Sequence, residues 1–246
     1  MYLEVGDGEV LQSILGGMIA ERTPVLATKL STGESRVLFP FGEEGRDGAE
    51  GSQDDLPALV DDAMARDVVG RGDLTVLDRP DGPVFLRVYS PRLRLVIVGA
   101  VHIAQPLAAM ARAAGLDVVV VDPRKAFATT DRFPEIQLLH QWPEEALGEL
   151  NLDQRTAVVT LTHDPKLDDP GLLAALPSPA FYVGALGSRR TQARRVERLR
   201  EAGLTAEQVA RIHGPIGLDL GGETPSEIAV AILAEIIATR RGRRPE

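Results

Sequence analysis

Residues 96–104 read VIVGAVHIA, and this stretch decides how the rest of the chain is interpreted. An apolar run ends at a glycine, and residues suited to a helix follow it. The order of strand, glycine turn and helix is the one with which α/β proteins open a nucleotide pocket. The position that usually carries the second glycine holds Val101. The stretch predicts a Rossmann-like fold and leaves nucleotide binding open.

The alternation of short apolar strands and helices continues toward the end of the chain. Short apolar strands, among them LDVVVVD at 116–122 and TAVVTLT at 156–162, alternate with amphipathic helices. Strands that are apolar throughout are covered on both faces, which is typical of a parallel sheet. We therefore expect an α/β fold in which residues 93–246 form a doubly wound Rossmann-like parallel sheet.

Residues 1–92 have a different character and predict a small N-terminal α+β domain. Their net charge is −8, whereas residues 93–246 carry −1. Apolar spacing and turn residues predict the elements of this domain. They are a helix at 9–21, two strands within 24–41, a loop at 42–54, a helix at 55–66 and a hairpin at 75–89.

Composition excludes several classes of function. The 246 residues include no cysteine, so disulfides, thiolate metal sites and a cysteine nucleophile are excluded for this chain. A net charge of −9 disfavours nucleic acid as a partner. No apolar run reaches the length of a membrane span, and the acidic start MYLEVGDGEV does not resemble a signal peptide. We expect a cytoplasmic protein that binds neither nucleic acid nor membrane.

The turn at Gly99, Ala100, Val101 and His102 supports two interpretations. As a dinucleotide site it keeps the first glycine, and Asp122 ends the next strand where an acidic residue would hold a ribose hydroxyl. Alternatively the turn serves folding, and Asp122 caps a strand end. His102 is expected in the first turn of the following helix, where it either hydrogen-bonds a phosphate or pterin-like ligand or packs at the turn.

Thr162, His163 and Asp164 follow the strand TAVVTLT and supply a hydroxyl, an imidazole and a carboxylate. In an open parallel sheet, ligands bind beyond the carboxyl ends of the strands. His163 and Asp164 can therefore act as acid and base. The alternative is that Asp164 is the N-cap of a helix running through Asp168 to Leu176.

Gly187, Ser188 and Arg189 follow the strand AFYVGAL and give the strongest local binding signal. A small residue, an N-cap serine and arginines at the start of a helix form an anion cradle. Arg190 and Arg194 have the alternative of a solvated helix face, so Ser188 and Arg189 are favoured.

The segment 213–227, HGPIGLDLGGETPSE, divides into a cap and a loop. Thr224 and Glu227 form a capping box for the last helix, which accounts for them structurally. His213 and Asp219 are not explained in this way. They lie in a long loop of the kind that often lines a site, and we include them as candidate binding residues.

These strand-end motifs together resemble the XdhC/CoxI family of accessory factors for molybdenum hydroxylases. The stretches that carry the resemblance lie within about residues 93–240. They are VVVVDPRKAF, VVTLTHD, SPAFYVGALGSRRTQARR and HGPIGLDLGGETPSEIAVAILAEI. Two features depart from the family. Its turn usually reads Gly-x-Gly-His, where this chain has Val101 before His102, and its N-terminal Ser-Gly-Gly-Cys motif has no counterpart here.

The resemblance implies a maturation factor. Such a protein binds molybdenum cofactor (molybdopterin) as cargo and delivers it to the apoenzyme of a molybdenum hydroxylase, of the xanthine or carbon monoxide dehydrogenase type. A cysteine desulfurase partner and a homo-oligomer are also implied. Neither a catalytic nor a metal-ligating residue is assigned.

Two other functions stay open on the residues alone. One is an NAD(P)-dependent oxidoreductase with His163 or His213 as acid and base, which Gly99 and Asp122 favour and Val101 disfavours. The other is a degenerate Rossmann scaffold or regulatory module without a ligand.

Overall fold

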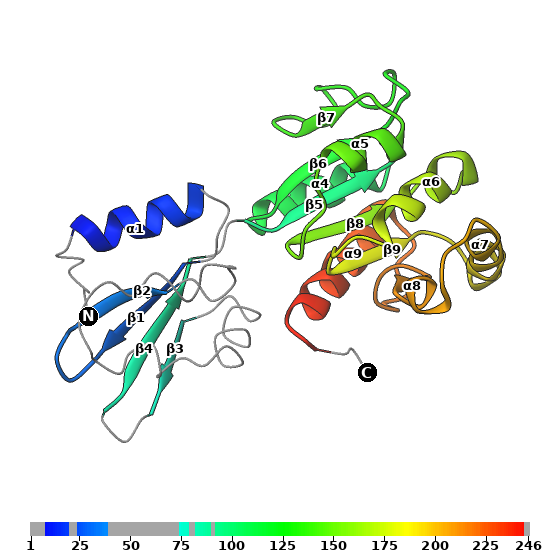
Figure 1. Cartoon of the computed structure of the whole chain (residues 1–246). Helices are drawn as coiled ribbons and strands as arrows, with labels where there is room; N and C mark the ends of the chain where they lie inside the picture. Colours follow the sequence, from blue (N-terminus) through cyan, green and yellow to red (C-terminus); the bar gives the residue numbers. More distant parts are fainter. Residues whose placement is uncertain (1–7, 20–23, 39–73, 79–81, 90–91, 244–246) are drawn as a thin grey trace. The chain divides into compact units, whose positions relative to one another are not determined.

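The computed structural model describes residues 8–19, 24–38, 74–78, 82–89 and 92–243. The chain divides into two compact units, Met1–Pro91 and Arg92–Glu246 (Figure 1). Each unit has its own sheet and its own buried apolar side chains.

The first unit contains a four-stranded antiparallel sheet and one described helix, α1 (Gly8–Ile19). The strand order is β2-β1-β4-β3. The strands are β1 (Val25–Lys29), β2 (Ser35–Leu38), β3 (Leu74–Leu77) and β4 (Val84–Val88). The predicted strand pair and hairpin are thereby confirmed. The loop expected at 42–54 and the helix expected at 55–66 lie outside the described residues.

The second unit is built on a six-stranded sheet with the order β10-β9-β8-β5-β6-β7, and every pairing in it is parallel. The strands are β5 (Arg94–Val98), β6 (Asp117–Val121), β7 (Gln137–Leu139), β8 (Thr156–Thr160), β9 (Tyr182–Ala185) and β10 (Ile212–His213). From β5 the chain moves outward to β6 and β7, and then returns to the other side of β5 for β8. This reversal confirms the doubly wound Rossmann-like architecture and puts a topological switch point between β5 and β8.

Helices cover both faces of this sheet (Figure 1). The helices are α4 (Ala104–Ala113), α5 (Pro143–Glu149), α6 (Pro165–Ala175), α7 (Arg189–Glu201), α8 (Ala206–Ala210) and α9 (Pro225–Arg240). One apolar cluster joins the sheet to α4 and α9, and a second joins it to α5, α6, α7 and α8. Leu95 and Ile97 of β5 enter the first cluster, whereas Val96 and Val98 enter the second. A strand whose two faces are both buried is apolar along most of its length, which is the pattern of residues 95–98.

Two predicted helix caps are confirmed. The Asp164 carboxylate accepts a hydrogen bond from the Lys166 amide at the start of α6. Thr224 and Glu227 form both bonds of a capping box at the start of α9. Within the described ranges, none of the helices combines the length and the apolar character that crossing a membrane requires.

Candidate functional site

The strand register brings the predicted loops to one edge of the six-stranded sheet. Val98 of β5 lies beside Val121 of β6 and Thr160 of β8, and Thr160 lies beside Ala185 of β9. These four residues end their strands. The turn after β5, Asp122 and the loops after β8 and β9 therefore begin at the same carboxyl edge, where open α/β sheets bind ligands.

Gly99 is required by its conformation and by its neighbour. Its φ is +104°, a value that L side chains rarely adopt. A Cβ at this position would lie 2.2 Å from Cγ2 of Thr162, so the turn after β5 and the loop after β8 touch at the switch point. The structure therefore requires glycine at position 99 whether or not a nucleotide binds there.

Asp122 is fully buried, and its carboxylate is already occupied by hydrogen bonds. It accepts from the Ala100 amide at 2.8 Å, and from the backbone and guanidinium of Arg124 at 2.8–2.9 Å. Burial alone would raise the pKa of Asp122, but these hydrogen bonds outweigh it and hold the pKa below its usual value. All four acceptor positions of a carboxylate are used, which matches the strand-end cap rather than a ribose ligand.

The residues after Gly99 differ from the expectation in one respect. The structure begins α4 at Ala104, so His102 is exposed in the turn before the helix and not in its first turn. The reason is local: the Ala104 amide donates to the Val101 carbonyl, which closes a separate turn. Ile103 at the N-cap has no side-chain acceptor for the helix amides. The Val101 side chain is half-buried and packs against the cluster below α4.

The loop after β8 is organised by Asp168, a residue of α6 that is 1% exposed. Its carboxylate accepts from the Thr162 hydroxyl at 2.6 Å and from the amides of Thr162 and His163 at 3.3 and 3.1 Å. Burial raises the pKa of Asp168, and the hydrogen bonds from Thr162 and the charge of Arg195 oppose that rise. The His163 side chain is exposed.

Asp168 also meets Arg195 of α7, and this buried pair ties the loop after β8 to the loop after β9. Nη2 of Arg195 is 3.5 Å from Oδ2 of Asp168 and 2.8 Å from the Leu186 carbonyl, while Nη1 is 2.8 Å from Oε1 of Gln192. Nε of Arg195 is buried and has no partner among the described residues. A buried cation with an unused donor is a feature that calls for a ligand or a functional reason.

The start of α7 confirms Ser188 as an N-cap. Its Oγ accepts from the Thr191 amide at 3.1 Å and lies 3.0 Å from the Thr191 hydroxyl. Gly187 has a φ of +150°, and a Cβ there would lie 3.1 Å from the Thr191 side chain. Arg189 is exposed. Ser188 and Gly187 therefore have structural roles, and the binding roles predicted for them and for Arg189 stay predictions.

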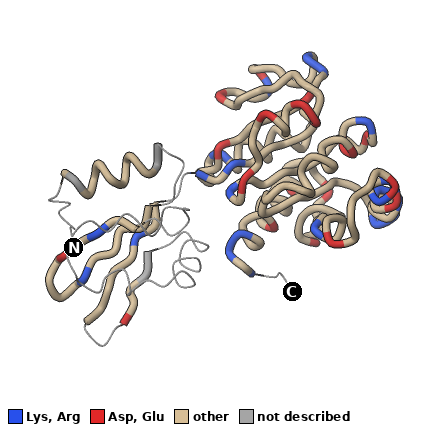
Figure 2. Tube along the Cα trace, viewed as in Figure 1, with Lys and Arg blue, Asp and Glu red and all other residues tan. Residues whose placement is uncertain are grey.

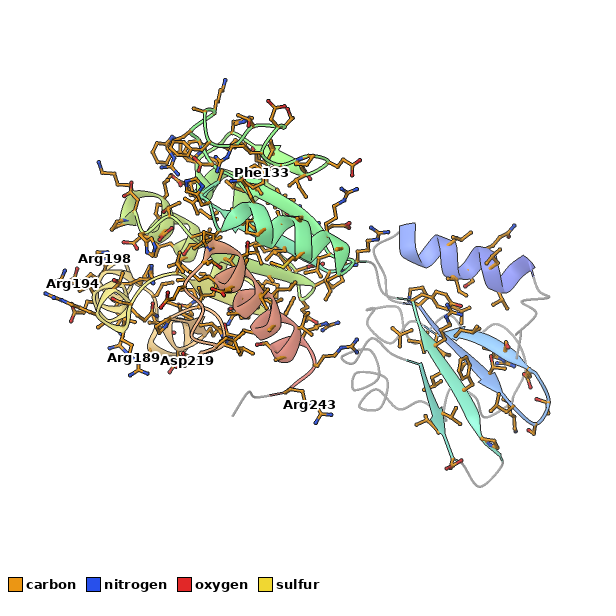
Figure 3. All side chains as sticks on the ribbon, turned by 180° about the vertical axis from the view of Figure 1, so that it is seen from behind. Phe133, Arg189, Arg194, Arg198, Asp219 and Arg243 are labelled. Carbon is orange, nitrogen blue, oxygen red and sulfur yellow. The ribbon has the colours of Figure 1, made fainter. Side chains whose placement is uncertain are left out.

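A cavity of about 420 Å³ opens between the first turns of α6 and the α7 helix. Its lining includes His163, Asp168, Arg190, Arg194, Arg195 and Arg198. Figure 2 shows how basic residues gather on α7. In Figure 3, Arg194 and Arg198 lie on one side of this helix, and Arg189 projects from another side.

His213 belongs to a second polar cluster. Its ring stacks on Tyr182 with centroids 4.4 Å apart, and its Nδ1 is 3.1 Å from Oε1 of Glu235 in α9. Oε2 of Glu235 accepts from the Tyr182 hydroxyl at 2.5 Å and from the Gly217 amide at 2.8 Å. These bonds fasten β10 and the following loop to the sheet, which gives His213 a structural role. Asp219 is exposed in that loop.

The most deeply buried parts of the site were not identified from the sequence. Asp168 and Arg195 were missed because nothing local distinguishes them from neighbouring charged residues. A sequence signal does exist for the other arginines of the cavity, because a spacing of four residues places side chains on one face of a helix. The residues with this spacing are Arg190, Arg194 and Arg198. Which helix face meets α6 depends on tertiary packing.

Comparisons with known proteins agree with the fold. Residues 95–236 match the family model described as the XdhC Rossmann domain. The chain is 35% identical over 159 residues to a probable xanthine dehydrogenase subunit of Bacillus subtilis, with 64% of this chain and 46% of that protein covered. It is 32% identical over 152 residues to the molybdenum cofactor insertion chaperone PaoD of Escherichia coli, with 62% and 42% covered.

A crystal structure described as a xanthine dehydrogenase from Bacillus halodurans superposes with a TM-score of 0.70. It shares 24% identity and covers 95% of this chain and 67% of that one, which shows a common fold. The chain spans less than half the length of the curated relatives it matches.

Proposed function

The chain belongs to the XdhC family, and from this premise we propose that its Rossmann domain binds molybdenum cofactor as cargo and delivers it to a molybdenum hydroxylase. The observation that carries the proposal is the match of 142 residues, 95–236, to the family's Rossmann domain. The similarity to a molybdenum cofactor insertion chaperone and to part of a probable xanthine dehydrogenase supports the same role. A client of the xanthine or carbon monoxide dehydrogenase type, a cysteine desulfurase partner and homo-oligomerisation belong to the proposal as its finer predictions.

The chemistry of the site fits the anionic part of this cargo. Molybdopterin carries a phosphate, and the carboxyl edge offers the uncapped start of α4 and the basic start of α7. The chain contributes no thiolate, because it has no cysteine. We therefore propose that this chain holds the cargo through the pterin and its phosphate. It supplies no cysteine sulfur to the metal.

The geometry favours this cargo over a nicotinamide cofactor. A ribose hydroxyl would have to compete with Arg124 and Ala100 for the Asp122 carboxylate. The Thr162 methyl group fills the space beside Gly99, and Val101 replaces the glycine that lets a backbone approach a pyrophosphate. We expect NAD(P) to bind weakly at this turn.

The direct test is binding of molybdenum cofactor released anaerobically from a donor enzyme. Equilibrium filtration with fluorescence detection of the pterin measures the stoichiometry, and NAD and CDP serve as competitors. We expect one cofactor per chain and no displacement by millimolar NAD. Absence of bound pterin would refute the cargo proposal, and displacement by NAD would favour the oxidoreductase.

Arg189→Ala tests the residue that the sequence favours. A lost charge-assisted hydrogen bond should weaken pterin binding by about 1–3 kcal/mol. The melting temperature should hardly change, because Arg189 is exposed. A large loss of stability with unchanged binding would mean that Arg189 is structural.

A further inference from the structure

The arginines of α7 are divided between two faces of the helix. Successive residues of an α-helix are rotated by about 100°, so Arg190, Arg194 and Arg198 share one face. That face lines the cavity toward α6. Arg189 and Arg200 do not line this cavity and are exposed. The basic character of the cavity is therefore a property of one face and not of the whole helix.

Two of the cavity arginines are not engaged by the described part of the chain. Neither Arg190 nor Arg194 forms a hydrogen bond or an ion pair with any residue that the structure describes. Arg198, in contrast, is held by Asp169 through two bonds of 2.6 and 2.9 Å. Arg190 and Arg194 are thus available to a ligand, and the side of the cavity formed by Arg198 is already fixed.

The deepest arginine gives an independent sign of a ligand. Arg195 is 2% exposed and lines the cavity, and its buried Nε has no partner within the described ranges. Its other nitrogens are fixed by Gln192, Leu186 and Asp168. A buried and immobilised guanidinium adds a fixed positive charge to the wall of the cavity, and its unused donor is a feature that calls for an explanation.

Charge balance leaves the cavity positive. Four arginines line it, and two aspartates, Asp168 and Asp169, neutralise part of their charge. The remaining excess of two positive charges suits a ligand with at least two negative charges. Guanidinium groups bind carboxylate and phosphate oxygens alike, but a simple carboxylate carries only one negative charge, so the charge balance favours a phosphoryl group.

We propose that the cavity between α6 and α7 binds a diphosphate-class anion, held by Arg190 and Arg194 beside the buried guanidinium of Arg195. The site lies beyond the carboxyl ends of β8 and β9, one strand away from the glycine turn. The inference deepens the proposed function and rests on it only for the natural ligand, which we assign as the phosphate end of the cargo.

The experiment uses inorganic pyrophosphate as the probe, in isothermal titration calorimetry of the full chain at low ionic strength. The test variants are Arg190→Gln and Arg194→Gln. Arg200→Gln is the matched control, because it removes the same charge from the exposed face of the same helix. Arg195 stays intact, since removing it would leave Asp168 buried without its cation.

We expect each test variant to weaken pyrophosphate binding about 10- to 100-fold, and the control to change it less than about twofold. Melting temperatures should be alike, because both test residues are exposed. Equal losses in all three variants would reveal general charge attraction and overturn the site. Absence of pyrophosphate binding to the unmodified chain would overturn it too.

A competition arm separates this inference from the proposed function. Saturating pyrophosphate should displace bound molybdenum cofactor, and Arg194→Gln should weaken both ligands. If the cofactor stays bound beside pyrophosphate, the assignment of the cavity to the cargo is wrong. If pyrophosphate binds as expected but the cofactor never does, the anion site stands and the proposed function fails.

Discussion

Replacing Gly99 with alanine is the sharpest test of how the switch point is built. The substitution adds one Cβ to a backbone with a φ of +104°. It also puts that atom 2.2 Å from Cγ2 of Thr162, far inside contact distance. Two separate costs are expected, and a second substitution can remove one of them.

The magnitudes follow from the two causes. A side chain forced to a positive φ costs roughly 1–2 kcal/mol. Overpacking against a buried neighbour typically costs about 1–3 kcal/mol. Gly99→Ala should therefore lower the free energy of unfolding by about 2–5 kcal/mol.

Thr162→Ser separates the two costs, because it removes Cγ2 and keeps the hydroxyl that donates to Asp168 at 2.6 Å. In a double-mutant cycle, Gly99→Ala combined with Thr162→Ser should recover the steric part, about 1–3 kcal/mol. The cost of the positive φ should remain in the double variant.

Urea unfolding followed by tryptophan fluorescence measures all four proteins. The sequence has a single tryptophan, Trp142, and it is the N-cap of α5 in the same unit as Gly99. A loss below about 1 kcal/mol in Gly99→Ala would refute both the conformation and the contact. If Gly99→Ala loses the expected free energy of unfolding and the double variant recovers none of it, the contact with Thr162 would be refuted, whereas the cost of the positive φ would stand.

Three further predictions concern buried charges and the glycine turn. Asp168→Asn should lower the free energy of unfolding by about 3–5 kcal/mol in the same urea assay, because it leaves the Arg195 charge buried without its anion; a loss under about 1 kcal/mol would contradict this account. The pKa of Glu235 is held below its usual value, since its hydrogen bonds outweigh the effect of burial, so its contribution to stability is present above the ordinary pKa of a glutamate and is lost as the pH falls through the lowered value. The difference in unfolding free energy between the unmodified chain and Glu235→Gln should therefore shrink in acid, and a difference that grows as pH falls would show the sign to be wrong. Val101→Gly should gain no measurable affinity for NAD in a filtration assay, because Asp122 stays occupied by Ala100 and Arg124 and the Thr162 methyl group still fills the space beside Gly99. It should lower stability, because the Val101 side chain packs against the apolar cluster; a clear gain in affinity would mean that Val101 is the main obstacle to a pyrophosphate.

The fold could be predicted because its pattern is continuous along the chain. Residues 95–98 of β5 and 157–159 of β8 alternate between the two helical layers and are all buried, so burial is visible as a short run of apolar residues. The prediction that His102 lies in the first turn of α4 was wrong, because the helix begins at Ala104 for a reason that periodicity does not show. The turn closed by the Ala104 amide and the Val101 carbonyl depends on hydrogen bonding and not on hydropathy.

Around the candidate site, the sequence predicted only the features that depend on neighbouring residues, namely the helix caps. Ser188 was identified as a cap, and the cap was one of two roles left open for Asp164, because a cap depends on residues within one helical turn. The cavity arginines depend on how α7 is rotated against α6. That rotation follows from burying Leu199 and Arg195, and the second of these is a charged residue that no hydropathy pattern places inside.

The Arg195–Asp168 pair has a mechanical consequence for the two loops that it connects. Arg195 donates a hydrogen bond to the Leu186 carbonyl in the loop after β9, and Asp168 accepts hydrogen bonds from Thr162 and from the His163 amide in the loop after β8. The ion pair therefore connects the two loops. Displacing either loop would break the Arg195–Asp168 ion pair, and the other loop would then lose the contacts that this pair provides. The shape of the cavity wall is therefore coupled to the positions of both loops.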